Sequence, residues 1–278
     1  MAVRTAILIL LSLLLTGATD DFTCPMDKDV HSSVPGRCPR CGMKLVAALP
    51  DPVEYPLKMT LTPPAPKPGG TVDLTFAMSD PHTGKRITEF ETVHDKLFHL
   101  FVVSEDLQHF AHEHPQARPD GRFAYSYRVP ETGEYRLLAD LFPKGGTPQL
   151  IAKTLFVPGL RQHADLKTDV AAKEAENMRV SLRSEPTQPI AGLKTLLFFD
   201  ITPSEGLEPY LGAWGHMLAA SSDLIDMIHT HPAFGDPGPT IQFNVIFPRP
   251  GIYRVWVQFQ RAGTVNTVAF NVPVSALQ

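Results

Sequence analysis

The stretch HLFVVSEDLQHFAHEHP at residues 99–115 returns without a gap as HMLAASSDLIDMIHTHP at residues 216–232. A repeat of this length indicates that one domain is used twice along the chain. The shared polar positions are mostly histidine, and the two copies align His99 with His216, Asp106 with Asp223, His112 with His229, His114 with His231, and Pro115 with Pro232.

Other blocks extend the repeat on both sides. Gly70 and the apolar run after it correspond to Gly192 and the run that follows it. Downstream, the pattern Pro-x-x-Gly-x-Tyr-Arg occurs at residues 130–136 and again at 248–254. Insertions and deletions fall between these blocks, where we expect loops.

Short alternating or apolar runs bounded by Pro, Gly, Asp and Ser predict β-strands in each copy. Turns at this spacing, in a chain with 27 prolines, predict an all-β fold: two tandem antiparallel immunoglobulin-like β-sandwiches preceded by a small Cys-rich module. Ala171–Asn177 is the one stretch expected to be helical. The expected strands are Val72–Met78, Leu97–Val103, Arg122–Val129 and Tyr135–Leu141, with counterparts Thr195–Ile201, His216–Ala220, Thr240–Phe247 and Tyr253–Gln260.

The N-terminus has the pattern of a secretory signal peptide: a positive Met1–Arg4, an apolar Ala6–Leu15 and a small-residue cleavage site at Thr16–Ala18. We therefore expect an exported protein, periplasmic or secreted; an uncleaved membrane anchor is the alternative. The predicted organisation is a signal peptide at 1–18, a Cys-rich module at 22–48, sandwiches at 52–160 and 178–278, and a linker at 161–177.

The charge of the chain argues against a nucleic-acid partner. The formal net charge is −4 and no long basic stretch occurs, whereas binding to phosphates normally requires clustered Lys and Arg. All three cysteines lie within residues 24–41. An odd number cannot pair completely within one exported chain, which leaves either a disulfide with a free thiol or a metal–thiolate site.

The cysteines occur in FTCPMDKDVHSSVPGRCPRCGMKLV at residues 22–46. Cys38 and Cys41 have the spacing with which two thiolates grip one ion, and Cys24 is a third candidate ligand. The thioethers of Met26 and Met43 favour Cu(I), and His31 is a candidate nitrogen ligand. Because so short a segment buries little apolar surface, bound metal would supply its folding energy.

Residues 22–26 and 35–45 resemble the heavy-metal-binding domain of bacterial copper/silver efflux adaptors and some metal-transporting ATPases. In that family a histidine follows the first methionine, and here Asp27 and Lys28 replace the usual His-Pro. The resemblance implies copper, as Cu(I) at this module, or zinc, with one or more ions per chain. The two repeats resemble immunoglobulin-like domains of an uncharacterised secreted family, which indicates their fold rather than their activity.

The repeated histidines have the pattern of a second kind of metal site. Residues two apart in a strand share a face, so His112 and His114 point the same way, and a turn at Ser104–Leu107 would bring His99 beside them. The second copy offers His216, His229 and His231. Imidazole suits copper, zinc or nickel. The alternative is a structural role, in which these histidines bond backbone carbonyls.

Together these features predict an exported heavy-metal-binding protein, with copper as the expected metal, that acts in metal resistance, storage or hand-over to an efflux or membrane complex. The alternative is a structural or interaction protein of tandem sandwiches that docks on a membrane complex. An enzyme is not expected. Glu113 is the candidate general base for a zinc hydrolase, but Thr230 replaces it in the second copy, and without a sandwich cysteine a blue-copper site is excluded.

Overall fold

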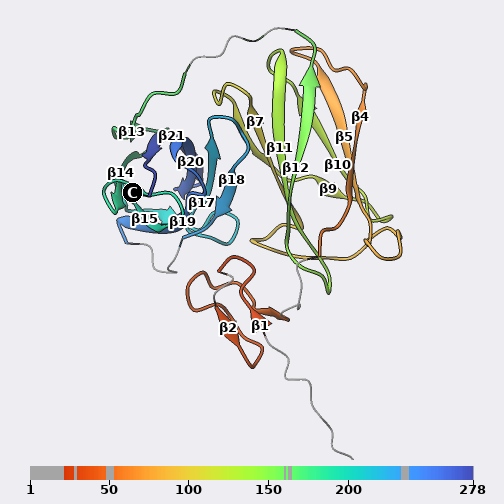
Figure 1. The fold of residues 1–278 in the computed structure, drawn as a ribbon, viewed down its shortest axis with the longest axis horizontal. Helices are drawn as coiled ribbons and strands as arrows, with labels where there is room; N and C mark the ends of the chain where they lie inside the picture. The colour runs from red at the N-terminus through yellow and green to blue at the C-terminus, as the bar shows by residue number, and fades with distance from the viewer. Residues whose placement is uncertain are drawn as a thin grey trace, which may run out of the picture.

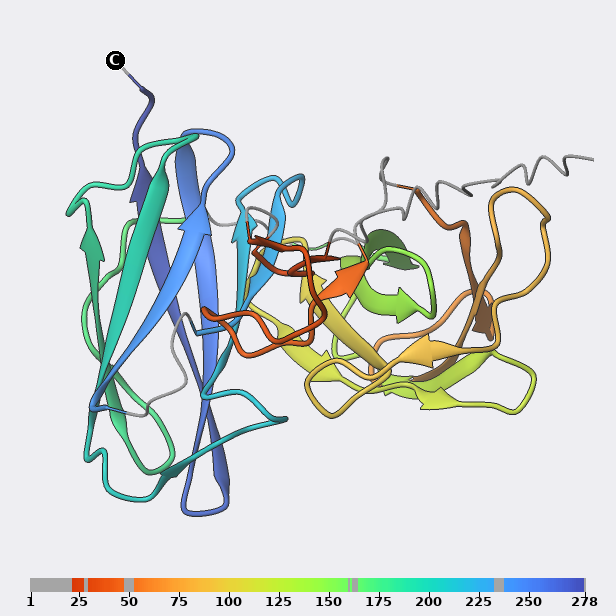
Figure 2. The same ribbon diagram turned by 90° about the horizontal axis from the view of Figure 1, so that it is seen from below.

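The computed structural model describes residues 22–27, 30–47, 53–159, 161, 165–232 and 238–277. The predicted signal peptide lies outside these residues. The described part of the chain is all-β: two sandwiches stand side by side, and the small N-terminal module lies at the junction between them (Figures 1 and 2). Among these residues, no helix has the length and apolar character needed to cross a membrane.

The first sandwich has the strand order of an immunoglobulin-like domain. One sheet runs β4-β5-β10-β9, and the other runs β12-β11-β7-β8, with β6 pairing to β11. Every pairing is antiparallel, and the order matches the ABED and GFC layout of that fold. The strands are β4 (Leu57–Thr62), β5 (Thr71–Met78), β6 (Phe90–Glu91), β7 (Phe98–Ser104), β8 (Phe110–Glu113), β9 (Gln116–Ala117), β10 (Phe123–Arg128), β11 (Gly133–Pro143) and β12 (Gln149–Val157).

The second sandwich repeats this plan. One sheet runs β13-β14-β15-β19, and in the other β20 pairs with β17, β16 and β21, while β17 pairs with β18. Its strands are β13 (Lys173–Glu174), β14 (Arg179–Glu185), β15 (Lys194–Thr202), β16 (Leu207–Glu208), β17 (His216–Ser221), β18 (Met227–Thr230), β19 (Thr240–Ile246), β20 (Gly251–Arg261) and β21 (Thr264–Val274). The all-β prediction with two antiparallel sandwiches is confirmed.

The repeated Pro-x-x-Gly-x-Tyr-Arg block forms the same corner in both sandwiches. The Tyr135 hydroxyl accepts from the Glu131 backbone N–H at 3.1 Å, and the Tyr253 hydroxyl accepts from the Arg249 backbone N–H at 3.2 Å. Both rings are buried in their sandwich cores. A tyrosine that ties the start of this strand to the preceding loop is a hallmark of immunoglobulin-like domains.

The predicted helix over Ala171–Asn177 is wrong. Lys173 and Glu174 form β13, which pairs with β14 at the edge of the second sandwich. A segment of seven residues is too short to offset the cost of nucleating a helix by itself. The backbone N–H of Asn177 instead donates to the Asn266 side chain at 3.1 Å, so this part of the predicted linker packs as sandwich edge.

The N-terminal module has three two-residue strands, β1 (Phe22–Thr23), β2 (His31–Ser32) and β3 (Val46–Ala47), in the order β2-β1-β3. Its fully buried side chains are Cys24, Cys38 and Leu45. A core this small supplies little hydrophobic stabilisation, so the module depends on an additional cross-link.

The two sandwiches pack through equivalent faces of the sheets that contain β7 and β17. Their shared apolar cluster draws the same positions from each copy, in an approximately twofold arrangement. Across this interface the Phe110 ring stacks on Trp256, with ring centroids 5.1 Å apart. The aligned pairs in the cluster are Phe101 with Leu218, Val103 with Ala220, Leu107 with Leu224, and Leu138 with Trp256.

We predict that Trp256→Ala lowers the free energy of unfolding by about 3–5 kcal/mol, because it leaves a cavity in this interface. Urea titration measures the change. Phe156→Ala is the control: that ring is 58% exposed, and its removal should cost less than about 0.5 kcal/mol. Equal losses in the two variants would show that the interface contributes no stability.

Candidate metal centres

The three cysteines and Asp27 converge in the N-terminal module. The Sγ atoms of Cys24 and Cys41 are 3.4 Å apart, and Cys38 Sγ is 3.6 Å from Asp27 Oδ2. The four ligand atoms all lie within 4.8 Å of one another. Around a tetrahedral ion with Zn–S bonds of about 2.3 Å, sulfur atoms lie about 3.8 Å apart. We refer to Cys24, Asp27, Cys38 and Cys41 as the cysteine site, and its dimensions fit one tetrahedral metal ion.

Asp27 was not among the predicted ligands. Its backbone N–H donates to Cys24 Sγ at 3.2 Å, which folds the carboxylate back over the thiols. Arg40 Nη1 lies 3.5 Å from Asp27 Oδ1, so the guanidinium holds one oxygen while Oδ2 faces the sulfurs. The signal in the sequence was its position, since Asp27 stands where the resembling family has a histidine.

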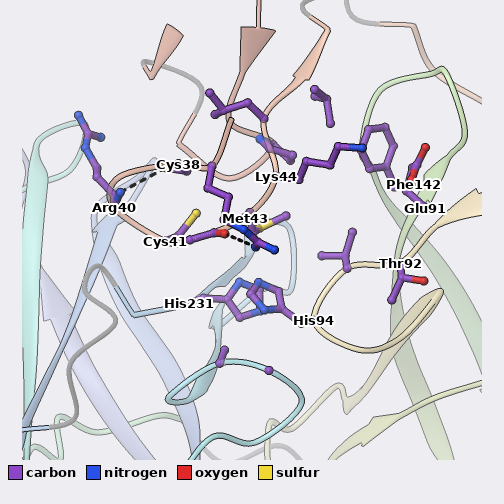
Figure 3. Close-up of a pocket in the computed structure, with 18 of the residues that line it drawn as sticks. Cys38, Arg40, Cys41, Met43, Lys44, Glu91, Thr92, His94, Phe142 and His231 are labelled. Carbon is purple, nitrogen blue, oxygen red and sulfur yellow. Dashed lines mark hydrogen bonds between the residues drawn. The ribbon is translucent and has the colours of Figure 1, made fainter. Parts of the chain in front are cut away.

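The other predicted module ligands are distributed around this site. His31 is exposed in β2, paired with Thr23, and is not part of the four-residue group found among the described residues. Among the described residues, Asp27 and not His31 completes the group with the three cysteines. Met26 packs against the module core. Met43 lines a cavity beneath the module (Figure 3).

The thiols share protons unequally. A hydrogen bond from Cys41 lowers the pKa of Cys24 to about 6, and the same contact raises the pKa of Cys41. Burial raises the pKa of Cys38. One thiolate is therefore formed at neutral pH, which is the protonation state that binds a metal ion.

In the first sandwich, His99 on β7 and His112 and His114 at the end of β8 form a group whose ligand atoms lie within 4.8 Å of one another. In the ladder His112 pairs with Phe101, which places it diagonally beside His99. His99 Nδ1 lies 3.0 Å from His112 Nε2.

The second sandwich builds the corresponding group from His216 on β17, His229 on β18 and His231 just after it. All three side chains are buried. His216 Nδ1 lies 3.0 Å from His231 Nε2. Both predicted histidine groups are therefore brought together, while the binding of metal to them stays a prediction.

Hydrogen bonds fix which imidazole nitrogens carry protons in the first group. The Val93 carbonyl only accepts, so His99 donates to it through Nε2 at 2.9 Å and keeps a lone pair on Nδ1. His112 donates through Nδ1 to Gln258 Oε1 at 2.7 Å and keeps a lone pair on Nε2. These two lone pairs face each other at 3.0 Å. Nitrogens bound to one tetrahedral ion at about 2.0 Å lie about 3.3 Å apart, so a cation would relieve this repulsion.

Each sandwich supplies a side chain that orients a histidine of the other sandwich. His112 of the first bonds Gln258 of the second, and His229 Nδ1 of the second lies 2.6 Å from Asp140 Oδ2 of the first. Asp140 and Gln258 are equivalent, since they pair with His99 and His216 in their own sheets. A carboxylate on one ring nitrogen orients a histidine and makes the other nitrogen a better metal ligand.

Several imidazole nitrogens are buried with no hydrogen-bond partner in the described part of the chain. Such atoms are costly unless they meet a ligand. They are His94 Nε2, His114 Nε2, His229 Nε2 and His231 Nδ1.

The two groups form one continuous cluster at the sandwich interface. The ring centroids of His99 and His216 are 5.7 Å apart, those of His112 and His216 are 5.3 Å apart, and His94 lies 3.7 Å from His231. We call the six repeated histidines of this cluster, His99, His112, His114, His216, His229 and His231, the interdomain histidine centre; His94 lies beside it, against His231.

Burial keeps six imidazoles of this cluster neutral. It lowers the pKa of His94 and of His114 to about 3 and that of His99 to about 4. It also lowers the pKa values of His112, His216 and His231. Neutral imidazole is the form that binds metal, so these six imidazoles need no deprotonation near neutral pH.

The oxygen donors near the repeated block have structural roles. Asp106 pairs with Arg161 at 2.6 Å, and Asp223 pairs with Arg249 at 3.0 Å, each beside its hairpin turn. Asp226 accepts from the Tyr253 hydroxyl at 2.7 Å, and its counterpart His109 contacts the Tyr127 hydroxyl at 2.6 Å. These residues stabilise the hairpins and lie outside both histidine groups.

The class of protein that this geometry defines is a pair of immunoglobulin-like sandwiches with an N-terminal heavy-metal-binding module. Residues 22–48 match the heavy metal binding domain family. The family described as domain of unknown function DUF8832 matches twice, at residues 53–158 and 171–276. The chain belongs to this DUF8832 family, with the two-repeat layout expected from the sequence.

No curated protein matches the chain. Among solved structures, the adhesin FdeC of Escherichia coli is similar at 16% identity and a TM-score of 0.28, covering 85% of this chain and 68% of its own. The fibronectin(III)-like modules of CbhA from Clostridium thermocellum are similar at 9% identity and a TM-score of 0.22, covering 79% of this chain and 95% of theirs. The fold assignment rests on the strand order and not on these likenesses.

We predict that the metal-free protein loses stability as the pH falls below about 6.5. The unfolded chain binds protons at histidines near that pH, whereas His94 and His99 bind them in the folded state only near pH 3 and pH 4. Their contribution to the free energy of unfolding is therefore fully present above pH 6.5 and is lost progressively as the pH falls to 4. Between pH 7.5 and 5.5 each of the two histidines should cost up to about 1.4 kcal/mol.

Urea titrations in chelator at the two pH values measure this loss. His82→Gln, which removes an exposed histidine, should keep the full pH dependence, whereas His99→Gln should reduce it. A pH-independent free energy of unfolding would contradict the burial of neutral imidazoles.

Proposed function

We propose that this is an exported metal-binding protein that holds one heavy-metal ion at the cysteine site and further ions at the interdomain histidine centre. Its roles would be metal resistance, storage or hand-over to an efflux complex. The observation that carries the proposal is the convergence of Cys24, Asp27, Cys38 and Cys41 within 4.8 Å, in a segment that matches the heavy metal binding domain.

The donor set supports a divalent ion at the cysteine site. Three thiolates alone suit Cu(I), but a carboxylate is a hard donor that Cu(I) does not need. Three sulfurs with one oxygen complete a tetrahedral Zn(II) site of the closed, structural kind. We therefore propose zinc or a similar divalent ion there, with copper or zinc at the imidazoles.

Export accords with this assignment. In an oxidising compartment, thiols 3.4 Å apart such as those of Cys24 and Cys41 are at risk of disulfide formation. A bound ion would occupy all three sulfurs of the odd set and keep the module folded. The predicted leader and the cysteine site thus support one picture, in which metal replaces disulfides.

The contacts of the histidines favour metal binding over a purely structural role. A structural histidine satisfies its nitrogens with protein groups, as His99 and His216 each do with one backbone carbonyl. Their remaining nitrogens face other imidazoles, and three nitrogens of the centre have no partner among the described residues: His114 Nε2, His229 Nε2 and His231 Nδ1.

We propose binding and not catalysis. The candidate base Glu113 is hydrogen-bonded to the Tyr125 hydroxyl, and it points from β8 to the face opposite His112 and His114. A zinc hydrolase needs its base beside the metal-bound water.

For the cysteine site, native mass spectrometry and competition titration of the full-length protein with Zn(II) and Cu(I) test the proposal. Wild type should retain one ion at this site. Asp27→Asn should weaken Zn(II) binding at least tenfold and leave Cu(I) binding unchanged, because only Zn(II) uses the carboxylate. Cys41→Ser should weaken both.

His31→Gln is the matched control in the same module and should behave as wild type. Retention of no ion by the wild type would refute the proposal. Equal losses in His31→Gln and Asp27→Asn would refute the ligand set.

For the histidine centre, Asp140→Asn should weaken metal binding about 10–100-fold, the usual effect of removing an orienting carboxylate. Titration of the Cys41→Ser protein isolates this centre from the cysteine site. Asp120→Asn, an exposed carboxylate paired with Arg122, is the control. Identical affinities in the Asp140 and Asp120 variants would show that His229 is not a ligand.

A further inference from the structure

One cavity joins the cysteine site to the interdomain histidine centre. It measures about 1070 Å³ and lies between the module and the two sandwiches. Cys38, Cys41 and Met43 line it from the module, and His94 and His231 line it from the sandwiches. Figure 3 shows Cys41 and Met43 on one side of this space, with the rings of His231 and His94 across from them.

His94 and His231 present unsatisfied nitrogens at this wall. Their ring centroids are 3.7 Å apart, and neither His94 Nε2 nor His231 Nδ1 has a hydrogen-bond partner in the described chain. His231 continues inward through its contact with His216 Nδ1 at 3.0 Å. The pair therefore stands between the cavity and the rest of the histidine centre.

The fold does not explain why residue 94 is a histidine. Its counterpart in the second copy is Leu211, and both residues have the same left-handed backbone, with φ of 47° and 51°. A leucine thus meets the conformational demand of this position. The imidazole is an addition of the first copy, at the place where the cavity reaches the centre.

The charges around the cavity disfavour a free cation. Arg37, Arg40 and Lys44 line it together with Glu91 and Asp95, so cationic side chains outnumber anionic ones there. The three cationic side chains would repel a bare metal ion. An ion that stays bonded to a sulfur or nitrogen donor at each step has its charge partly compensated by that donor.

We propose that this cavity is a transfer passage, through which a soft or borderline heavy-metal ion moves between the cysteine site and the interdomain histidine centre by way of Met43, His94 and His231. The ion keeps its oxidation state. At each step one metal–ligand bond forms as another breaks, and a thiolate that loses the ion takes up a proton. This inference rests on the proposed function.

Stopped-flow absorption of the reduced, full-length protein mixed anaerobically with two equivalents of Co(II) tests it. Thiolate-to-cobalt charge-transfer bands report the cysteine site, and weaker ligand-field bands from nitrogen-bound cobalt report the histidine centre. In the wild type the thiolate band should form first and the histidine-centre bands should follow. His94→Leu should slow that second phase at least tenfold and leave both final amplitudes unchanged.

Matched variants separate ligand exchange from simple obstruction. His94→Met has the volume of leucine but keeps a soft donor atom, so it should restore most of the wild-type rate. Cys41→Ser should also slow the filling of the histidine centre, because it removes a donor at the start of the passage. His82→Leu removes an exposed histidine and should change nothing.

A wild-type rate in His94→Leu would overturn the passage. So would a smaller final histidine-centre amplitude in that variant, which would make His94 a resident ligand. A slow phase in His94→Met equal to that of His94→Leu would likewise overturn it. Absence of both cobalt bands in the wild type would instead refute the proposed function.

Discussion

The two sandwiches hold each other's histidines in place. His112 of the first bonds Gln258 of the second at 2.7 Å, and His229 of the second bonds Asp140 of the first at 2.6 Å. These bonds form only when the sheets containing β7 and β17 face each other, so they depend on the apolar cluster around Phe101 and Trp256. The packing of the two repeats against each other therefore also determines the orientation of the imidazoles. Each sandwich alone would have its histidines without the partners that aim them.

The two copies of the repeat contribute different residues around the aligned histidines of the centre. Asp140 places a carboxylate behind His229, whereas its equivalent Gln258 places a neutral amide behind His112. His94, in a loop of the first copy, lies against His231 of the second copy's group, whereas its counterpart Leu211 has no donor atom in its side chain. An anionic orienting partner raises the basicity of an imidazole more than an amide does. The two groups should thus differ in affinity even though their histidines align.

Local patterns predicted the strands and the convergence of each histidine group well, because both follow from the period of a strand and from one hairpin. Local patterns could not predict the residues that orient the histidines. Gln258 lies 146 residues from His112, Asp140 lies 89 residues from His229, and the two differ in residue type although their positions are equivalent. Asp27 was not predicted as a ligand because a carboxylate stands here in place of the expected histidine. The predicted helix over Ala171–Asn177 failed because edge pairing outweighed weak local propensity.

We propose that the cysteine site and the interdomain histidine centre are both metal centres. A crystal structure of the zinc-loaded protein, with data collected on both sides of the zinc absorption edge, tests it most directly. We predict an anomalous peak surrounded by Cys24, Asp27, Cys38 and Cys41, and at least one more among the imidazoles. A Cys24–Cys41 disulfide with no anomalous density at either place would contradict the account.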